Sequence, residues 1–301
     1  MVRWSDHILS GAIAGLSLHP APPNKDLPSG LYIVATPIGN ARDITLRALD
    51  VLSGADAIAA EDTRVTGRLL DIHGVKHGPL IRYDEHAAAR VRPGLLARLA
   101  AGEAVALATD AGTPLVSDPG YRLAREAIEA GYRVFPIPGA SAPLAALALA
   151  GLPSDRFMFA GFPPQKSGQR KSWLGELAST RATLIFFENV KRLANSLDDM
   201  AEVLGDREAC VARELTKLHE EARRGTLASL AAHYKEAGPP KGEATIVVGP
   251  PPAPAAPAAE YIDARLRALL ETLSVKDAAR QAAAETGLPR GDLYARALKL
   301  K

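Results

Sequence analysis

The chain is poor in several residue types, and each scarcity excludes a class of protein. Cys210 is the single cysteine among 301 residues. This excludes an internal disulfide framework and is typical of a reducing compartment, so we expect a cytoplasmic protein. The formal net charge is only +2, and a nucleic-acid partner would therefore need a local basic patch. No apolar run approaches the roughly 20 residues of a membrane span, so we expect no membrane association.

Motifs of several common ligand sites are also missing. No G-x-G-x-x-G follows the apolar run 31–36, and neither G-x-x-x-x-G-K-[ST] nor G-x-S-x-G occurs. Dinucleotide-binding, triphosphate-binding and α/β-hydrolase sites are therefore poor matches. His73 and His77 lie four residues apart, but Gly74 and Gly78 interrupt any helix there. With one cysteine and scattered histidines, we expect no bound metal.

What the chain does contain is an alternation of short β-branched runs with longer amphipathic ones. This alternation predicts strands and helices in turn, and hence a largely parallel sheet covered on both faces. In the first half, the candidate strands are 31–36, 55–61, 79–83, 104–109 and 133–137. After the break "GLPSD", a second series follows at 156–161, 183–188, 209–214 and 244–248.

The predicted fold class is α/β, with two α/β domains of mostly parallel sheets and a small helical C-terminal tail. The expected segments are a poorly ordered extension (1–29), an N-terminal α/β domain (30–151), a C-terminal α/β domain (152–249), a Pro/Ala linker (250–260) and a helical tail (261–301). Within the extension, "ILSGAIAGLSL" resembles the apolar part of a signal peptide. Asp6 and His7 precede it and no clear cleavage site follows, which argues against secretion.

The tail contains a helix, a Gly287-Leu288-Pro289 turn and a second helix. This arrangement resembles a helix-turn-helix. For a segment of this length, we favour a docking or dimerising role over recognition of nucleic acid.

Three glycine-containing loops each follow a candidate strand of the first domain. They are "TPIGN" (36–40), "DAGTPLVSDPG" (110–120) and "PIPGASAP" (136–143). Loops at the carboxyl ends of parallel strands converge on one crevice, where backbone groups suit a large, mostly uncharged ligand. The alternative is that the three are unrelated turns.

These loops also carry a resemblance to a known family. The segments "LYIVATPIGNARDITLRAL", "AAEDTR", "ALATDAGTPLVSDPGYRL", "PIPGASA", "GLPSDRFMFAGFPPQKSGQRK" and "ARELTKLHEEARRGTL" are similar to the ribosomal RNA small subunit methyltransferase I family of the tetrapyrrole methylase superfamily. The resemblance extends from about residue 30 to 249. It implies an S-adenosylmethionine-dependent enzyme that methylates the 2′-hydroxyl of a cytidine in the decoding region of small-subunit ribosomal RNA.

The resemblance further implies a class III methyltransferase fold, with S-adenosylmethionine between the two domains and commonly a homodimer. The RNA partner would be naked small-subunit rRNA or the assembled small ribosomal subunit. The cofactor contacts that it implies are Pro37, Gly39, Asp110, Gly112, Thr113, Ser141, Ala142, Phe187, Leu215 and Thr245.

Two segments depart from the family's usual pattern. The family usually has a histidine and an asparagine where this chain has Asp84 and Ala87 in "YDEHAAAR". It often has "ESPHRL" where this chain reads "ENVKRL", with Val190 and Lys191. Both segments are candidates for contact with RNA, so the sequence does not identify which residues contact the RNA bases.

A ribose 2′-hydroxyl is a weak acid, so methylation calls for a base or a nearby cation. In "EDTR", we expect Glu61 or Asp62 to face the cleft and Arg64 to bind a phosphate; alternatively, Asp62 caps a helix at 63–73. In "RELTKLHEE", Glu214 and Lys217 are the second candidates, and a structural ion-pair cluster is the alternative.

A third candidate base is His86, although an uninvolved exposed histidine fits equally well. The segment "PPQKSGQRK" (163–171) is the best candidate for binding RNA phosphates. Its Lys166, Arg170 and Lys171, with glycine and serine between them, predict a flexible basic loop. Two rival functions remain. One is a methyltransferase of the same superfamily that acts on a tetrapyrrole-like small molecule, and the other is a non-catalytic cofactor- or RNA-binding assembly factor.

Overall fold

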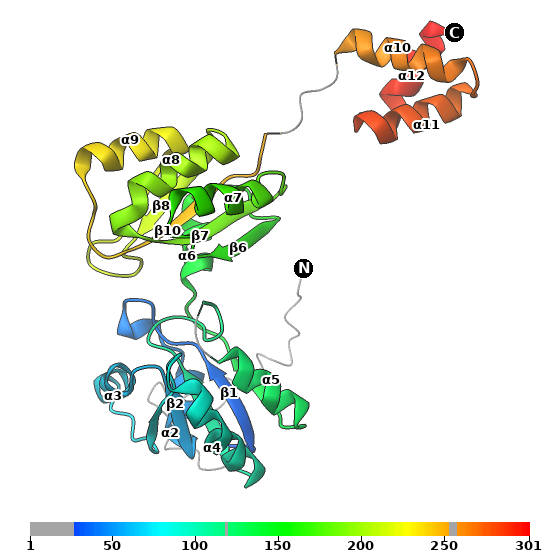
Figure 1. The fold of residues 1–301 in the computed structure, drawn as a ribbon. Helices are drawn as coiled ribbons and strands as arrows, with labels where there is room; N and C mark the ends of the chain where they lie inside the picture. Colours follow the sequence, from blue (N-terminus) through cyan, green and yellow to red (C-terminus); the bar gives the residue numbers. More distant parts are fainter. Residues whose placement is uncertain (1–26, 118–119, 253–257) are drawn as a thin grey trace, which may run out of the picture. The chain divides into compact units, whose positions relative to one another are not determined.

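The computed structural model describes residues 27–117, 120–252 and 258–301. The chain forms two compact units that divide between Pro251 and Pro252 (Figure 1). The expected extension 1–29 lies outside the described residues except for its last three. Among the described residues, every helix is too short or too polar to cross a lipid bilayer.

The first sheet of the larger unit is entirely parallel, as predicted. Its strands are β1 (Gly30–Val34), β2 (Ala57–Ala60), β3 (Leu80–Arg82), β4 (Ala104–Ala108) and β5 (Val134–Ile137). They lie in the order β3-β2-β4-β1-β5. The chain leaves β1 toward β2 on one side and leaves β4 toward β5 on the other. The switch point of this doubly wound sheet therefore lies between β1 and β4.

Helices cover both faces of the first sheet because its strands are apolar on both sides. The helices α2 (Leu46–Gly54) and α3 (Thr63–Ile72) pack on the face that includes Val34 and Ile58. The helices α4 (Ala88–Ala100) and α5 (Tyr121–Glu129) pack on the opposite face, against Ile33 and Leu107.

The second sheet confirms the α/β class but corrects one detail. Its strands are β6 (Phe157–Gly161), β7 (Thr183–Asn189), β8 (Glu208–Arg213), β9 (Glu221–Thr226) and β10 (Glu243–Val248), in the order β6-β7-β10-β8-β9. Only β6 and β7 are parallel, and the other pairs are antiparallel. The prediction of a mostly parallel second sheet was therefore wrong. The connection 214–220 is shorter than the roughly dozen residues of a parallel crossover, so β8 and β9 form a hairpin.

Along β7, successive side chains alternate between the two faces of the second sheet. Leu184 and Phe186 face the helices α7 (Ser167–Leu177), α8 (Leu193–Leu204) and α9 (Leu227–Ala237). Ile185 faces α6 (Ala142–Ala150) on the other side (Figure 1). The strand β9 was missed because "EARRGT" lacks an apolar alternation, as is common at an exposed sheet edge.

The smaller unit contains α10 (Ala259–Leu270), α11 (Val275–Thr286) and α12 (Arg290–Leu300). Ser274 caps α11 by accepting a hydrogen bond from the Asp277 backbone. Gly287 ends α11 with φ of 72°, a left-handed conformation that glycine adopts without strain. Ile262, Leu266 and Leu293 contribute to a core of its own. The predicted helix, turn and helix are confirmed.

Candidate cofactor and substrate site

The loops after β1 and β4 are joined by reciprocal backbone hydrogen bonds. The Thr36 N–H donates to the Gly112 carbonyl at 2.8 Å, and the Gly112 N–H donates to the Thr36 carbonyl at 3.0 Å. The buried Thr36 hydroxyl adds a bond to the Thr109 carbonyl at 3.0 Å. Gly112 has φ of 84°, which disfavours any residue with a Cβ. The first two glycine loops therefore form one connected structure.

The loop after β5 is attached to the same structure. The Thr113 hydroxyl donates to the Ala140 carbonyl at 3.1 Å. A Cβ placed on Gly139 would stand 3.0 Å from the Ala35 Cβ, so glycine permits this close approach. The three loops thus converge as the strand pattern predicted, and they do so through backbone groups at the switch point of the first sheet.

The second sheet contributes an edge at which strands of opposite direction meet. Because β10 runs antiparallel to β7 and β8, its first residues lie beside the last residues of both neighbours. Thr245 pairs with Phe187 on one side and with Ala212 on the other. Two strand ends and one strand beginning therefore lie along a single edge.

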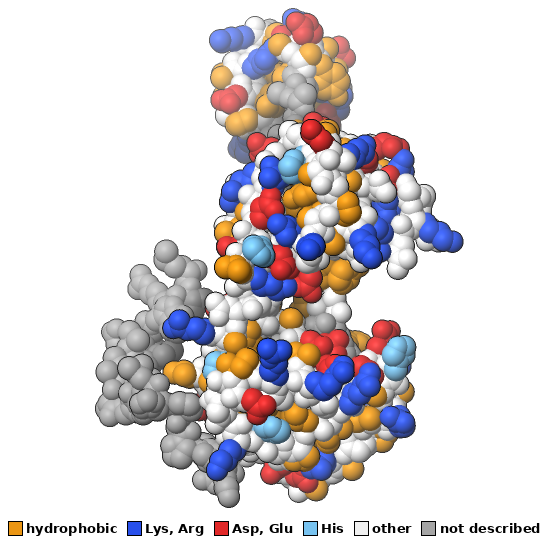
Figure 2. All heavy atoms as spheres, turned by 90° about the vertical axis from the view of Figure 1, so that its left-hand side faces the viewer, with side chains coloured by type: hydrophobic (Ala, Val, Ile, Leu, Met, Phe, Trp, Pro, Cys, Tyr) orange, Lys and Arg blue, Asp and Glu red, His pale blue; other side chains and the backbone are white. Residues whose placement is uncertain are grey.

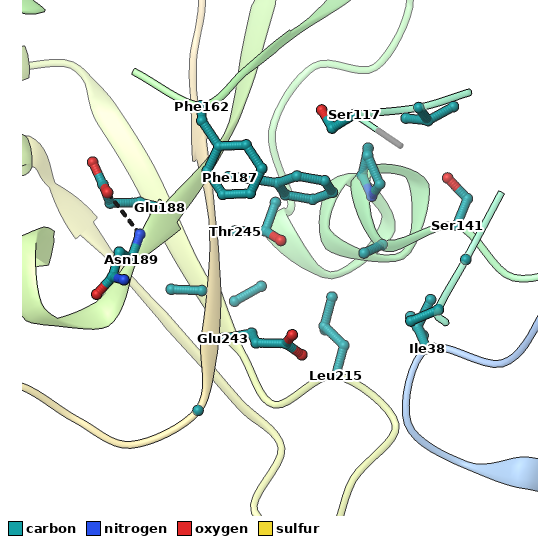
Figure 3. A pocket seen from close by; sticks show the side chains of 18 of the residues that line it. Ile38, Ser117, Ser141, Phe162, Phe187, Glu188, Asn189, Leu215, Glu243 and Thr245 are labelled. Carbon is teal, nitrogen blue, oxygen red and sulfur yellow. Dashed lines mark hydrogen bonds between the residues drawn. The ribbon is translucent and has the colours of Figure 1, made fainter. Parts of the chain in front are cut away.

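A cavity of about 520 Å³ is lined by both sets of residues, a volume within the usual range for small-ligand sites. Figure 3 shows Ile38, Ser117 and Ser141 on one side and Phe162, Phe187 and Thr245 on the other. The described lining residues are Ile38, Glu61, Asp110, Ala111, Gly112, Thr113, Val116, Ser117, Ser141, Ala142, Pro143, Phe162, Phe187, Glu188, Asn189, Val190, Lys191, Ala212, Leu215, Gly242, Glu243, Ala244 and Thr245.

Most of the expected cofactor contacts are among these residues. They are Asp110, Gly112, Thr113, Ser141, Ala142, Phe187, Leu215 and Thr245. Pro37 and Gly39 are not, although Ile38 between them is. A Cβ on Gly39 would stand 2.5 Å from the Lys217 Cγ and 2.7 Å from the Leu215 carbonyl oxygen. Gly39 therefore permits the first loop to pack against the loop after β8.

Of the candidate bases, Glu61 alone lines the cavity among the described residues. Its Oε2 accepts a hydrogen bond from the Asp110 N–H at 3.2 Å. The Asp110 Oδ1 in turn accepts from the Asp62 N–H at 2.9 Å. Burial raises the pKa of the Asp110 carboxyl. Reciprocal bonds between the ends of β2 and β4 thus hold Glu61 at the cavity.

The geometry of Asp62 and Arg64 matches the capping alternative. Asp62 is the N-cap of α3, and its Oδ1 accepts from the Arg64 N–H at 2.9 Å. The Arg64 guanidinium pairs with the same carboxylate at 2.5 Å and is 87% exposed. Hydrogen bonds from Arg64 hold the pKa of the Asp62 carboxyl well below its usual range. Asp62 does not line the cavity, and its carboxylate is occupied.

Glu214 and Lys217 form an ion-pair cluster next to the cavity. The Lys217 Nζ lies 3.0 Å from the Glu214 Oε1 and 2.9 Å from the Glu243 Oε2. Burial alone would lower the pKa of Lys217, but its bonds to Glu243 and Glu214 outweigh burial and raise it. The bond from Lys217 also lowers the pKa of Glu214. Only Glu243 of the three lines the cavity.

The backbone is strained around the same site. Leu115, Ser117, Glu214 and Thr216 have φ of 74°, 65°, 50° and 63°, a region that non-glycine residues rarely occupy. They belong to the loops after β4 and β8. Such strain persists where the surrounding structure imposes it, and it is concentrated at binding sites.

The predicted flexible basic loop was wrong. Ser167–Leu177 is the helix α7, and Arg170 is only 2% exposed. Its guanidinium binds Asp199 at 2.6 Å and also donates to the Pro164 and Gln165 carbonyls. Arg170 is therefore a structural residue and is unavailable to RNA.

Other basic candidates differ in their surroundings. Lys171 pairs with Glu202 at 2.6 Å, whereas Lys166 is exposed. Figure 2 shows Lys and Arg interspersed with Asp and Glu on one face, without a broad patch of one sign. Contact with an RNA would therefore depend on local groups.

The two segments that depart from the family pattern differ in whether they line the cavity. Asp84 accepts the Ala87 N–H at 2.7 Å and pairs with Arg82, and it does not line the cavity. His86 does not line it either. Val190 and Lys191, in contrast, are lining residues.

Several lining residues were not predicted from the sequence. Among them are Ile38, Ser117, Phe162, Glu188, Asn189 and Glu243. Glu188 and Glu243 come from the paired ends of β7 and β10. An antiparallel register between 183–188 and 244–248 would have indicated them, but the parallel sheet that the sequence predicted excludes that register.

The sequence is similar to two known protein families. Residues 30–231 match the model of the Tetrapyrrole (Corrin/Porphyrin) Methylases. Residues 255–301 match the RsmI C-terminal HTH domain. The second match covers the helix-turn-helix of the smaller unit.

Two curated relatives are similar over most of the chain. The ribosomal RNA small subunit methyltransferase I of Mesorhizobium japonicum is 54% identical, over 93% of this chain and 95% of the relative. The protein of the same name from Escherichia coli O157:H7 is 44% identical, over 89% of this chain and 94% of the relative.

Two solved structures share the fold at low identity. The methyltransferase CobJ has a TM-score of 0.56 at 20% identity, and covers 76% of this chain and 95% of its own. Uroporphyrin-III C-methyl transferase from Thermus thermophilus, complexed with S-adenyl homocysteine, has a TM-score of 0.52 at 19% identity. It covers 73% of this chain and 97% of its own. At such identities the likeness concerns the fold.

Proposed function

Because this chain belongs to the ribosomal RNA small subunit methyltransferase I family of the tetrapyrrole methylases, we propose that it methylates small-subunit ribosomal RNA at the 2′-hydroxyl of a cytidine in the decoding region. Its cofactor is S-adenosylmethionine. The observation that carries the proposal is the cavity, which joins three backbone loops of one sheet to the polar edge of another.

The residues of the cavity fit this cofactor. Gly112, Thr113 and Ser141 offer backbone and hydroxyl groups that suit its polar ends, and Leu215 and Phe187 offer apolar surface for its adenosine. When bound, S-adenosylmethionine supplies an electrophilic methyl group on a sulfonium. The glycine loops are fixed to one another by hydrogen bonds, so this half of the site is preorganised.

Glu61 is the group that we assign to take up the hydroxyl proton. One carboxylate oxygen is held by the Asp110 N–H, and the residue lines the cavity. A carboxylate at the site can accept the proton as the oxygen attacks. Glu61→Gln keeps the hydrogen bond and removes the base, so we expect kcat to fall by about 10²-fold or more with little change in cofactor affinity. Asp62, Glu214 and Lys217 then have structural roles. We expect their substitution to lower the free energy of unfolding and to leave kcat largely unchanged.

Contacts to RNA phosphates are assigned to exposed cations. Lys166 is exposed at the start of α7, and the exposed Arg64 lies in the first turn of α3. We expect the enzyme to act as a homodimer in the cytoplasm, on rRNA that is naked or within the small subunit. Light scattering on the purified protein tests the dimer separately from activity.

The proposal is tested with tritiated methyl groups. The protein is incubated with labelled S-adenosylmethionine and small ribosomal subunits, or rRNA extracted from them, from a strain that lacks this methylation. We expect label in the RNA and 2′-O-methylcytidine after digestion to nucleosides. Label on a base, or in a nucleoside other than cytidine, would contradict methylation at the 2′-hydroxyl of a cytidine.

The same experiment separates the rival functions. A small-molecule methyltransferase would bind the cofactor and leave the RNA unlabelled under all conditions. A non-catalytic assembly factor would retain RNA on a filter without transferring label. Either result would overturn the proposed function while leaving the cavity and its cofactor intact.

A further inference from the structure

An exposed aromatic ring lines the cavity. Phe162 follows Gly161, whose φ of 73° turns the chain between β6 and α7, and its side chain is 57% exposed. Its ring centroid lies 5.3 Å from that of Phe187, which lies 4.8 Å from that of Phe159 (Figure 3). Phe162 thus packs on one side against Phe187, while much of its surface is exposed to solvent. An exposed aromatic surface contributes no hydrophobic stabilisation to the fold.

A cation without an ion pair lines the same cavity. Lys191 lies in a 3₁₀ turn directly after β7, and the Asn189 Oδ1 holds its backbone N–H at 2.9 Å. Lys191 is the one Lys or Arg among the described lining residues. The lining carboxylates Glu188 and Glu243 pair with cations from outside the cavity, whereas Lys191 has no ion pair within the described part of the chain. Its charge is therefore available to a ligand.

We propose that Phe162 and Lys191 form a subsite for the nucleotide to be methylated. The base stacks on Phe162, and Lys191 binds a phosphate next to the target ribose. This inference rests on the proposed function, since it concerns the RNA of that same reaction.

The chemistry of the reaction calls for such a subsite. A nucleotide brings its ribose hydroxyl into the cavity more easily when its base is unstacked from its neighbours, and unstacking the base is unfavourable. Proteins that bind unstacked nucleotides offset this cost with an aromatic side chain and a nearby cation. Phe162 and Lys191 supply both groups at the one cavity that also holds Glu61.

The exposure of the two rings distinguishes this subsite from the cofactor site. Phe187 is half-buried and pairs with Thr245 across the strands, as expected for an inner wall. Phe162 is far more exposed, as expected for a group that meets a large ligand arriving from solvent. Stacking of Phe162 on the adenine of the cofactor is the competing assignment, and the experiment separates the two.

The test measures RNA binding and cofactor binding independently. The RNA probes are fluorescein-labelled single-stranded oligonucleotides with one central cytidine or an abasic ribose in its place, followed by anisotropy. S-adenosylhomocysteine binding is followed by calorimetry. The variants are Phe162→Ala, Phe162→Tyr, Lys191→Gln and Lys191→Arg. Phe157→Ala and Lys76→Gln are matched controls, since both residues are exposed and lie outside the described cavity lining.

For Phe162→Ala we expect roughly tenfold weaker binding of the cytidine probe. The abasic probe should be unaffected, and Phe162→Tyr should restore the loss. For Lys191→Gln we expect several-fold weaker binding of both probes and a salt slope smaller by about 1, with Lys191→Arg close to the original protein. S-adenosylhomocysteine affinity should change less than twofold throughout.

Two results would overturn the subsite. Equal losses for the cytidine and abasic probes, or no loss beyond that of the controls, would exclude stacking on Phe162. A tenfold loss of S-adenosylhomocysteine affinity in Phe162→Ala would assign the ring to the cofactor instead. Failure of the proposed function looks different, because the original protein would then transfer no methyl group to RNA whatever the behaviour of these variants.

Discussion

The two sheets of the larger unit have five strands each, yet they build the cavity in different ways. The first is wholly parallel, so all of its strands end at one edge and the loops that follow them meet there. The second is mostly antiparallel, and its contribution comes from paired strand ends of opposite direction. The first sheet presents loops that are joined by hydrogen bonds, with Gly112, Thr113 and Ser141 among the lining residues, while the second presents residues of paired strand ends such as Phe187, Glu243 and Thr245.

This difference separates two tasks. Backbone loops bound to one another are rigid and insensitive to side-chain identity, which suits a cofactor that is the same in every cycle. Side chains along an open sheet edge are free to vary, which suits a substrate that differs among enzymes of one fold. Variants of each half should therefore fail in recognisably different ways.

The largest effect is expected in the helical layer of the second sheet. Arg170→Met removes the closest cation from the buried Asp199 carboxylate and leaves it, among the described residues, only the Ser167 hydroxyl at 3.0 Å and the Lys171 Nζ at 3.6 Å, so we expect the free energy of unfolding to fall by about 3 kcal/mol in chemical denaturation. The exposed Lys166→Gln should change it by less than about 0.5 kcal/mol and weaken RNA binding instead. A stable Arg170→Met protein with a reduced salt slope for RNA would instead restore Arg170 as an RNA contact.

The next effect concerns the contact between the two halves. Gly39→Ala places a Cβ 2.5 Å from the Lys217 Cγ and 2.8 Å from the Thr216 Oγ1, which forces the loops apart. We expect a loss of about 1–3 kcal/mol in stability and at least tenfold in S-adenosylhomocysteine affinity by calorimetry. Gly94→Ala is the matched control, since it has open space within α4 and should be stabilising by about 0.5–1 kcal/mol. Unchanged affinity in Gly39→Ala would mean that the loops adjust independently.

A smaller effect tests the backbone half alone. Thr36→Val removes the hydroxyl bond to Thr109 and keeps the shape, so we expect about 1 kcal/mol lower stability and a few-fold weaker cofactor binding. Thr66→Val is its control, because the buried Thr66 hydroxyl has no hydrogen-bond partner among the described residues and its removal should be neutral or stabilising. Equal losses in both variants would show that the threonine shape, and not the bond, matters.

The smallest effect depends on pH. Lys217 has a raised pKa and Glu214 a lowered one, from ordinary values of 10.5 and 4.5. The ion pair is therefore fully present between these values. Its stabilisation is lost as pH falls through the lowered pKa of Glu214 or rises through the raised pKa of Lys217. Lys217→Met should differ from the original protein by about 1 kcal/mol at pH 7, and by less at pH 3. A difference that is independent of pH would exclude the ion pair as its source.

The predictions from sequence succeeded where local pattern and topology agree. The β-branched runs identified every strand of the first sheet, and parallel strands compel their carboxyl-end loops to converge. Asp110, Gly112, Thr113 and Ser141 were therefore predictable from the order of strands and loops along the chain. Glu188 and Glu243 were missed because their proximity depends on an antiparallel register between segments that are distant in the chain. Phe162 was missed although it follows β6, which is parallel to β7.

Arg170 illustrates the other kind of error. A run of lysine and arginine with glycine and serine looks like a flexible basic loop, and only the packing of α7 against α8 shows that its second cation faces Asp199. Asp62 is the reverse case, since the capping alternative was already readable from its place before a helical pattern.

By itself, the sequence determined the strands of the first sheet, the three glycine loops, the helix-turn-helix and the family, because each is encoded in residues close together or in long, specific motifs. The tertiary structure decided which carboxylate lines the cavity, which cations are already paired, and which side chains of the second sheet meet the loops of the first. Those properties are set by register and burial between distant segments, and no local pattern carries them.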